Sequence, residues 1–252
     1  MATYIQGDIH EVIKTLDTDS VQLLYTNPPF GITECKWDTS LAWSPEFWAE
    51  IWRVMVPTGI VVLHASGKFA DLLTASQLNT KRYEYVWVKN RVTGHMFSKF
   101  QPMRQTERVM VFYRKNGTYN RQMRGDEVHA TRYTKANDYY TRGKTKPPDT
   151  HHVGRNPTDV LNYPVHIRDG KTVSDAMVEY FVRTYSNPGD TVLDMTCHNE
   201  VVGNVVTKLG RSYTGVDATL PAHLISHDPV TTLTLSPSPD GTTHTEASFA
   251  GD

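Results

Sequence analysis

The residues with the clearest chemical character are Asn27, Pro28, Pro29 and Phe30, which follow one another directly. They come straight after an apolar run at residues 20–25 that is rich in strand-forming side chains. The two prolines exclude a helix start and supply no backbone N–H, which leaves carbonyl oxygens without local partners. An amide oxygen, these carbonyl oxygens and a flat aromatic ring could together hold a planar group that carries an NH2.

The same four residues resemble the catalytic motif of amino-methyltransferases, in which Asp, Asn or Ser, then Pro-Pro, precede Tyr, Phe or Trp. The resemblance implies that the Asn27 side chain and the Pro28 carbonyl accept both hydrogens of an adenine amine. Such acceptors favour the tetrahedral nitrogen of the transition state. Phe30 would stack on a base that has left the duplex. The alternative is that Asn-Pro-Pro forms an ordinary turn.

A second stretch with chemical character runs from residue 191 to residue 217. It reads as a short buried strand ending at Asp194, a turn, a helix from about residue 199 to residue 209, and a second strand ending at Asp217. A strand–turn–helix–strand unit with an acid at the end of the second strand is the layout of nucleoside-binding α/β folds. Asp217 is therefore the candidate acceptor for ribose hydroxyls, the alternative being a surface carboxylate at a strand end.

The run at residues 182–194, then Leu209-Gly210-Arg211 and residues 214–217, resembles the S-adenosylmethionine half of bacterial and phage DNA amino-methyltransferases. The Asn-Pro-Pro-Phe motif precedes this half, which is the permuted order of the β class, and the similarity covers about residues 4 to 218. It implies a cofactor site made by five residues: Asp8, Asp194, Thr196, Asn199 and Asp217. For Asp8, a helix N-cap is the alternative role.

The cofactor loop departs from the pattern of this family, which is Pro-Phe-x-Gly-Ser-Gly-Thr after the acid. Here residues 195–201 read Met-Thr-Cys-His-Asn-Glu-Val, so His198 and Glu200 replace both glycines. Glycines let a backbone approach a ligand closely. Glu200 could repel the carboxylate of the cofactor or bind its ammonium group. Members of this family also carry a His-Pro-Thr-x-Lys-Pro segment. Residues 169–174 stand in its place here and do not match it.

Residues 114–155 are strongly basic in a chain whose formal net charge is -1. The segment holds four acidic residues, four interleaved tyrosines and no apolar periodicity. It is expected to be an irregular insertion, residues 114–159, that contacts DNA phosphates and bases, the alternative being a solvated loop. The basic residues are Arg114, Lys115, Arg121, Arg124, Arg132, Lys135, Arg142, Lys144, Lys146 and Arg155, of which Arg121, Arg124, Arg132, Lys135, Arg142 and Lys144 are the candidate DNA-binding residues.

Composition limits the remaining possibilities. Two cysteines, Cys35 and Cys197, offer neither a disulfide framework nor a metal-ligand set. No apolar run reaches the length of a membrane span, and no signal peptide is visible at the start. We therefore expect a cytoplasmic protein of a bacterial or phage-infected cell, with no metal and no membrane partner, as a monomer or homodimer.

The elements that must position these residues indicate an α/β fold. Strands are expected at residues 3–6, 20–25, 60–64, 83–89, 107–114, 191–194 and 212–217, with helices at 10–16, from 44, 68–76, 176–185 and 199–209. A polar loop is expected at residues 90–95. His64 is expected to be a satisfied histidine at a sheet edge. The prediction is a Rossmann-like methyltransferase fold with a mainly parallel sheet and helices on both faces. Its domain comprises residues 1–113 and 160–218, and residues 219–252 form a mostly disordered tail.

The expected function is S-adenosylmethionine-dependent methylation of the N6 amine of adenine in double-stranded DNA. N4-cytosine methylation is the nearest alternative, although Ser is then more frequent at the position of Asn27. The chain could also be a DNA-binding relative with a decayed cofactor loop, or a protein-glutamine or RNA methyltransferase. The sequence does not indicate a recognition site or a paired restriction nuclease.

Overall fold

The computed structural model describes residues 1–252 except 33–34, 36–37, 40, 131–150, 166–172 and 225–252. Its contacts divide the chain into two units. The larger unit combines residues 1–120 with residues from 159 onward, and the smaller unit is residues 121–158. The candidate catalytic and cofactor residues all belong to the larger unit.

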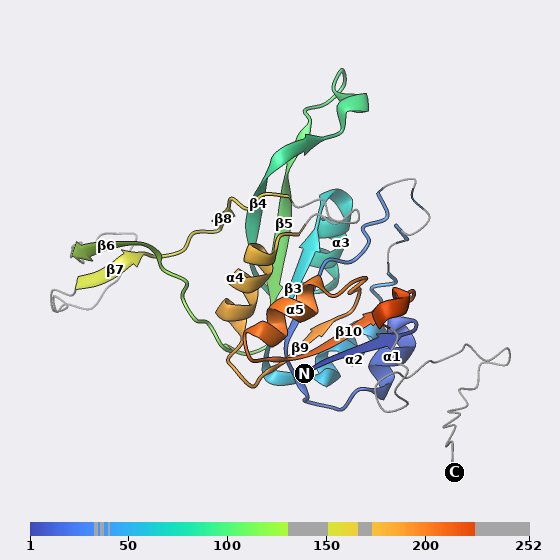
Figure 1. The fold of residues 1–252 in the computed structure, drawn as a ribbon. Helices are drawn as coiled ribbons and strands as arrows, with labels where there is room; N and C mark the ends of the chain where they lie inside the picture. Colours follow the sequence, from blue (N-terminus) through green and yellow to red (C-terminus); the bar gives the residue numbers. More distant parts are fainter. Residues whose placement is uncertain (33–34, 36–37, 40, 131–150, 166–172, 225–252) are drawn as a thin grey trace, which may run out of the picture. The chain divides into compact units, whose positions relative to one another are not determined.

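An eight-stranded sheet forms the centre of the larger unit, in the order β1-β10-β9-β2-β3-β5-β4-β8 (Figure 1). The neighbours pair in parallel except that β5 runs antiparallel to both β3 and β4. The strands are β1 (Ala2–Gln6), β2 (Val21–Thr26), β3 (Met55–Ala65), β4 (Lys81–Thr93), β5 (Arg104–Phe112), β8 (Val160–Leu161), β9 (Thr191–Asp194) and β10 (Ser212–Asp217).

The strand order reverses between β9 and β2. The strand β3 lies next to β2 on one side, whereas β9, β10 and β1 extend the sheet on the other side of β2. A reversal of this kind leaves a crevice at the carboxyl ends of the two central strands, where open α/β sheets bind their ligands. In this protein those ends are Thr26, which leads into Asn27, and Asp194.

Among the residues that the structure describes, five α-helices connect these strands. α2 begins after Ser44, whose side chain accepts a hydrogen bond from the backbone of Phe47, and Pro45 occupies its first turn, as helix starts favour. Two short 3-10 turns, η1 and η2, complete the set. The elements are α1 (Ile9–Thr15), α2 (Pro45–Val54), α3 (Gly67–Ser76), α4 (Asp175–Tyr185), α5 (Val201–Lys208), η1 (His95–Phe97) and η2 (Ala222–Leu224).

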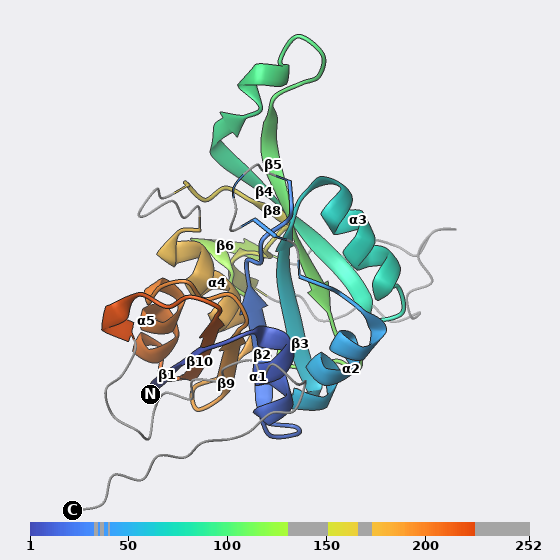
Figure 2. The ribbon, with the colours of Figure 1, turned by 90° about the vertical axis from the view of Figure 1, so that its right-hand side faces the viewer.

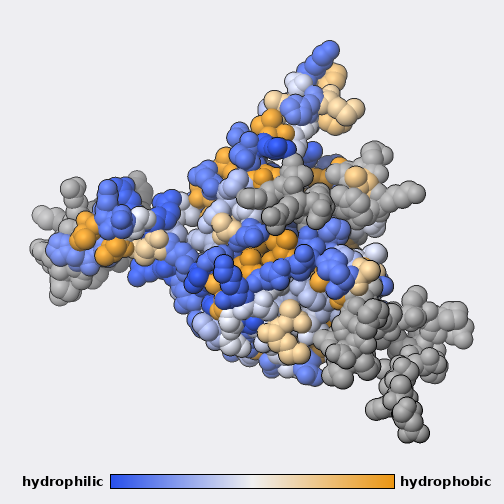
Figure 3. Space-filling model, in the orientation of Figure 1, coloured by the Kyte–Doolittle hydropathy of each residue, from blue (hydrophilic) through white to orange (hydrophobic). Residues whose placement is uncertain are grey.

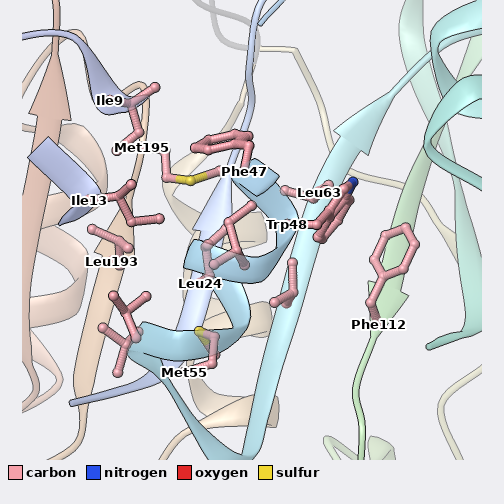
Figure 4. Close-up of a cluster of buried hydrophobic side chains, with 14 of the residues drawn as sticks. Ile9, Ile13, Leu24, Phe47, Trp48, Met55, Leu63, Phe112, Leu193 and Met195 are labelled. Carbon is pink, nitrogen blue, oxygen red and sulfur yellow. The ribbon is translucent and has the colours of Figure 1, made fainter. Parts of the chain in front are cut away.

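The helices cover both faces of the sheet (Figure 2). On one face α1, α2 and α3 pack on the strands around Trp48, and Figure 4 shows this cluster from α1 across to Phe112 on β5. On the other face α4 and α5 pack around Phe181 and Tyr213. Burial on both faces explains why the central strands read as continuous apolar runs rather than alternating ones. The predicted Rossmann-like fold, with a mainly parallel sheet and helices on both faces, is confirmed.

One expectation about the larger unit was wrong. Residues 90–95 were predicted to be a polar loop, but Asn90–Thr93 continue β4, and η1 follows after Gly94, whose φ is 92°. Polar composition concealed these strand residues because β4 here pairs with β5 alone, so neither face needs apolar side chains. The strand β3 is also longer than residues 60–64, since it begins directly where α2 ends.

The smaller unit holds an antiparallel pair of strands, β6 (Arg124–Ala130) and β7 (His151–Arg155). The segment was expected to be irregular, and its strands lack the apolar alternation that would have indicated them. Gly125 and Gly154 both have positive φ, and a Cβ on Gly154 would lie 2.6 Å from the carbonyl oxygen of Gly125. Glycine therefore permits the close approach of the two strands at this point.

Candidate active site

The ends of β2 and β9 are joined by a hydrogen bond between buried side chains. The hydroxyl Oγ1 of Thr26 donates to Oδ1 of Asp194 over 2.8 Å, although the two residues lie 168 positions apart. Oγ1 of Thr196 lies 2.8 Å from Oγ1 of Thr26. Because each hydroxyl has one hydrogen, Thr196 is then the donor to Thr26. The start of the Asn-Pro-Pro-Phe segment is thereby fixed to the start of the candidate cofactor loop.

Asp194 is a buried carboxylate with several donors. Besides Thr26, it accepts hydrogen bonds from the backbone N–H of Thr196 at 3.2 Å and the hydroxyl of Tyr213 at 3.3 Å. Only 2% of the surface of Asp194 is exposed to solvent. Burial of a charge is costly unless hydrogen bonds compensate it. Asp194 therefore fixes the geometry of the switch point through these contacts.

The four residues of the predicted catalytic motif differ in exposure. Pro28 is buried, whereas Asn27, Pro29 and Phe30 are partly exposed. Phe30 stacks on Phe69 of α3, with ring centroids 5.4 Å apart. One face of Phe30 is thus supported by the core, and Asn27 follows directly after the end of β2.

Asp38 is a residue of this region that the sequence analysis did not single out. Its Oδ1 accepts from the backbone N–H of Gly31 at 2.8 Å, and its Oδ2 accepts from the N–H of Ile32 at 2.9 Å. The Asp38 side chain therefore holds the turn that follows Phe30. An Asp that accepts successive backbone N–H groups from across a loop leaves no periodic pattern in a sequence, so only the fold reveals it.

Asp217 connects the ends of three strands. Its Oδ2 accepts from the backbone N–H of His198 at 2.9 Å and its Oδ1 accepts from the N–H of Thr219 at 3.0 Å. Its carbonyl oxygen accepts from Gly7, just after β1. Each carboxylate oxygen can accept a second hydrogen bond, and the side chain is partly exposed.

The loop between β9 and α5 retains a backbone conformation that suits glycine. His198 has φ of 49°, in the left-handed region that non-glycine residues rarely adopt. Asn199 is buried, and its Oδ1 accepts from the N–H of Val201 at the start of α5. The carboxylate of Glu200 lies 3.3 Å from Nε2 of His223. The loop thus has a glycine-like backbone at His198, whereas Glu200, at the other glycine position, has an ordinary φ of -80°.

Asp8 is the N-cap of α1, which was the favoured alternative for this residue. Its Oδ1 accepts from the backbone N–H of His10 at 2.8 Å and lies 2.9 Å from Nδ1 of the same residue. Burial acts to raise the pKa of Asp8, but the hydrogen bonds with His10 outweigh burial and leave that pKa below its ordinary value. Because Gln6 pairs with Asp217 in the sheet, Asp8 and Asp217 follow neighbouring strand ends.

A buried chain of polar side chains leads from β2 across the sheet. The Tyr25 hydroxyl lies 3.0 Å from Nε2 of His64, whose Nδ1 lies 3.0 Å from Oε1 of Glu107. Nζ of Lys89 lies 2.8 Å from Oε2 of the same carboxylate. Burial, with the charges of Asp194 and Glu107, holds the pKa of Tyr25 well above its usual value, so its hydroxyl keeps its proton. The expectation that His64 is a satisfied histidine is confirmed, but it lies on the interior strand β3 rather than at a sheet edge.

Glu107 carries the negative charge of this chain. Burial acts to raise its pKa, but the hydrogen bond from His64 and the ion pair with Lys89 outweigh burial and hold the pKa below the usual 4.5. Because an ionised carboxylate can only accept, Nδ1 of His64 carries a proton. The chain ends two residues before Asn27, and it fixes β2, β3, β5 and β4 relative to one another at the carboxyl edge of β2.

The candidate DNA-binding residues are placed only in part. Arg121 and Arg124 are exposed in the smaller unit, where both guanidinium groups contact Asn156, at 3.2 Å and 3.5 Å. Arg132, Lys135, Arg142 and Lys144 lie outside the described residues. A cavity of about 440 Å³ is lined by Ile60, Tyr83, Tyr185 and neighbours at the opposite edge of the sheet from Asn27.

The described part of the chain holds neither a cluster of metal-ligating side chains nor a membrane-spanning helix. Among these residues, no group of three or more His, Cys, Asp or Glu side chains is placed to hold a metal ion. None of the described helices combines the length and the apolar character needed to cross a membrane.

The fold is Rossmann-like, and comparison with known families gives the class of protein. A family model described as DNA methylase, covering the N6 and N4 enzymes, matches residues 21–226, which is most of the chain. The protein therefore belongs to the N6/N4 DNA methylase family.

Individual relatives agree with this membership. The DNA adenine methyltransferase YhdJ of Escherichia coli (strain K12) is 25% identical over 237 residues, covering 85% of this chain and 78% of YhdJ. The PvuII DNA methyltransferase, which is cytosine-N4-specific, superposes with a TM-score of 0.63 at 12% identity, covering 89% of this chain and 84% of the other. The complex of M1.HpyAVI with SAM superposes with a TM-score of 0.56 at 18% identity, covering 87% of this chain and 94% of the other.

The Thr26–Asp194 hydrogen bond gives a first testable prediction. Thr26→Val keeps the shape of this fully buried side chain but removes the donor, and the loss of a hydrogen bond to a charged group costs about 1.5–3 kcal/mol. Thr26→Ser keeps the hydroxyl and removes one methyl group, at about 0.8 kcal/mol. Urea unfolding should therefore rank the stabilities as wild type, Ser, then Val. A Val variant as stable as the Ser variant would contradict the role given to the hydroxyl.

Glu107 gives a second prediction. Glu107→Gln breaks a buried ion pair and should lower the free energy of unfolding by about 3 kcal/mol at pH 7. Because the pKa of Glu107 is lowered in the folded protein, its stabilisation is complete above pH 4.5 and is lost as the pH falls below that value. The difference between wild type and variant should therefore shrink in acid.

Glu84 supplies the matched control for Glu107. Glu84 also faces two cations, Arg108 and Lys81, but its side chain is 30% exposed against 5% for Glu107. Glu84→Gln should cost no more than about 1 kcal/mol, as exposed ion pairs do. Equal losses for the two variants in urea titrations at pH 7 would show that burial does not set the contribution of Glu107.

Proposed function

We propose that this protein transfers a methyl group from S-adenosylmethionine to the N6 amine of an adenine in duplex DNA. Membership of the N6/N4 DNA methylase family supports the reaction class. The observation that carries the proposal is the Thr26–Asp194 hydrogen bond at the switch point, because it holds the Asn-Pro-Pro-Phe segment beside the candidate cofactor loop. A methyl donor and an amine acceptor must meet at one such place.

The residues present fit the cofactor. His198, which replaces one loop glycine of the family, has the left-handed backbone that glycine adopts most readily, and its N–H is held by Asp217. Asp217 would bind the ribose hydroxyls through its remaining lone pairs, and Asp8 would face the adenine from the next strand end. Asp194, Thr196 and Asn199 would shape the loop around the amino-acid end. When bound, S-adenosylmethionine supplies an electrophilic methyl group.

Asn27 and Pro28 would activate the amine of the target base. The lone pair of this amine is delocalised into the ring, which makes it a weak nucleophile. The Asn27 amide oxygen and the Pro28 carbonyl would each accept one N–H, and two such acceptors stabilise a tetrahedral nitrogen. Phe30 would stack on the flipped base with the ring face that Phe69 leaves available. Orientation of the amine can supply about 7–11 kcal/mol of the barrier.

Adenine is favoured over cytosine by two observations. Asn stands at the first motif position here, where N4-cytosine enzymes more often have Ser. The relative YhdJ is named a DNA adenine methyltransferase. N4-cytosine methylation is the second candidate function, supported by the fold similarity to the cytosine-N4-specific PvuII enzyme.

Residues 114–159 would contact the DNA and select its sequence. The exposed guanidinium groups of Arg121 and Arg124 suit phosphate contacts, which hold a protein on the duplex. We assign the same role to Arg132, Lys135, Arg142 and Lys144 on the charge of the sequence alone.

Product analysis tests this proposal. Unmethylated plasmid DNA is incubated with the protein and tritiated S-adenosylmethionine, then digested to nucleosides for mass spectrometry. We expect N6-methyldeoxyadenosine. Asn27→Ala should lower kcat by about 10²–10³-fold, the usual loss of one group aimed at a transition state, with a smaller change in KM.

Asn204→Ala is the control, because Asn204 is exposed on α5 and should leave kcat unchanged. N4-methyldeoxycytidine as the product would replace the first candidate function by the second. Full activity of Asn27→Ala would contradict the role of the motif.

A further inference from the structure

The strands β4 and β5 continue past the rest of the sheet as a two-stranded arm, defined here as residues 90–106 (Figures 1 and 2). The last residue of β3 pairs with Arg108, so β5 loses this neighbour before Arg104. β8 pairs with β4 only at Val86 and Trp87. Beyond these points the described strands of the arm pair only with each other, and Thr93 pairs with Arg104 near the tip.

The arm leaves the sheet at the same edge as the candidate active site. β4 runs antiparallel to β5, and β5 runs antiparallel to β3, which is parallel to β2. The end of β4 and the start of β5 therefore lie at the edge where β2 ends at Thr26. Arg104 is four residues beyond the last pair with β3, or about 13 Å at the rise of an antiparallel strand.

The tip of the arm is ordered by its own backbone. The N–H of Phe97 donates to the carbonyl of Gly94, and the N–H groups of Phe100 and Gln101 both donate to the carbonyl of Phe97. Despite this order, its large apolar side chains are not folded inward. Met96 is 91% exposed, Phe100 is 87% exposed and Phe97 is 54% exposed. Every residue from Asn90 to Thr106 is exposed or partly exposed.

The charge of the arm has one sign. Between Glu84 and Glu107 the sequence has no acidic residue, whereas the arm carries Arg91, Lys99 and Arg104, all exposed. Figure 3 shows apolar surface next to hydrophilic surface at the projecting end of the arm. An apolar tip flanked by cations complements a duplex, whose phosphates are anionic and whose base faces and thymine methyl groups are apolar.

We propose that this arm is a second DNA-contacting element, which enters a groove of the duplex beside the target base. A two-stranded ribbon fits the major groove of B-DNA. Met96, Phe97 and Phe100 contact bases at the tip, and Arg91, Lys99 and Arg104 bind the flanking phosphates. This inference rests on the proposed function for its substrate, but it assigns DNA contact to residues outside the basic segment 114–159.

Photocrosslinking tests the contact directly. The full-length protein with Phe100→p-benzoylphenylalanine is irradiated with fluorescein-labelled fragments of unmethylated plasmid DNA. We expect a protein–DNA adduct. The same crosslinker at Leu78 is the control, because Leu78 is 69% exposed but lies before β4, at the opposite edge of the sheet, and should give little adduct. Crosslinks between two copies of the chain without a DNA adduct would overturn the proposal, as would equal adducts from both positions.

The salt dependence of binding tests the cations. If Lys99 and Arg104 each neutralise one phosphate, the double variant Lys99→Gln, Arg104→Gln should reduce the slope of log K against log salt by about two units. Lys208→Gln, at the end of α5 where β10 begins, should leave the slope unchanged. An unchanged slope in the double variant would contradict the phosphate contacts.

Methyl transfer by the wild-type protein distinguishes a failure of the arm proposal from a failure of the proposed function. Phe100→Ala with Phe97→Ala should lower methylation of plasmid DNA at least tenfold while binding of S-adenosylmethionine alone is retained. Methylation by the wild type together with unaltered methylation by this variant would overturn the arm proposal only. A DNA adduct from the arm without methyl transfer by the wild type would contradict the proposed function and leave the arm supported.

Discussion

The organisation of this protein depends on the hydrogen bond between Thr26 and Asp194. It joins the ends of β2 and β9, two neighbouring strands whose sequences are separated by most of the chain. On one side of this bond the chain continues into Asn27 and the two prolines. On the other side it continues into the loop that His198 and Asp217 hold together. Because the sheet reverses its order here, both segments open onto one crevice, and the proposed methyl donor and acceptor can share it.

Buried charge maintains the edge of the sheet on which this crevice lies. Asp194 is compensated by hydroxyl and backbone donors, and Glu107 is compensated by His64 and Lys89. A buried carboxylate without partners would destabilise the fold, so these side chains are satisfied only when the strands are in register. The same edge carries the β4–β5 arm. The buried carboxylates Asp194 and Glu107, the candidate catalytic residues and the projecting apolar tip thus lie on one side of the structure.

The sequence predicted the structure best where a local pattern of residue types is enough to define an element. The strands ending at Thr26, Asp194 and Asp217 were predictable because buried parallel strands are continuous apolar runs. The N-cap role of Asp8 was open to prediction because its partner, His10, is adjacent. The chain of polar side chains from Tyr25 to Lys89 was not predictable, since its members come from four strands and only the register brings them together.

The β4–β5 arm and the ribbon of β6 and β7 were missed because strands that bury neither face need no apolar alternation. The role of Asp38 depends on a loop closure that spacing does not encode.

The central claim is that the switch point binds S-adenosylmethionine although His198 and Glu200 replace the glycines of the family. Isothermal titration calorimetry of the purified protein with S-adenosylmethionine, beside an Asp217→Ala variant, tests this most directly. We predict micromolar binding by the wild type and a loss of about 10–100-fold in the variant, which is the effect of removing hydrogen bonds to a charged group. No heat of binding with the wild type, even in the presence of DNA, would contradict the account and leave a DNA-binding member of the family without methyl transfer.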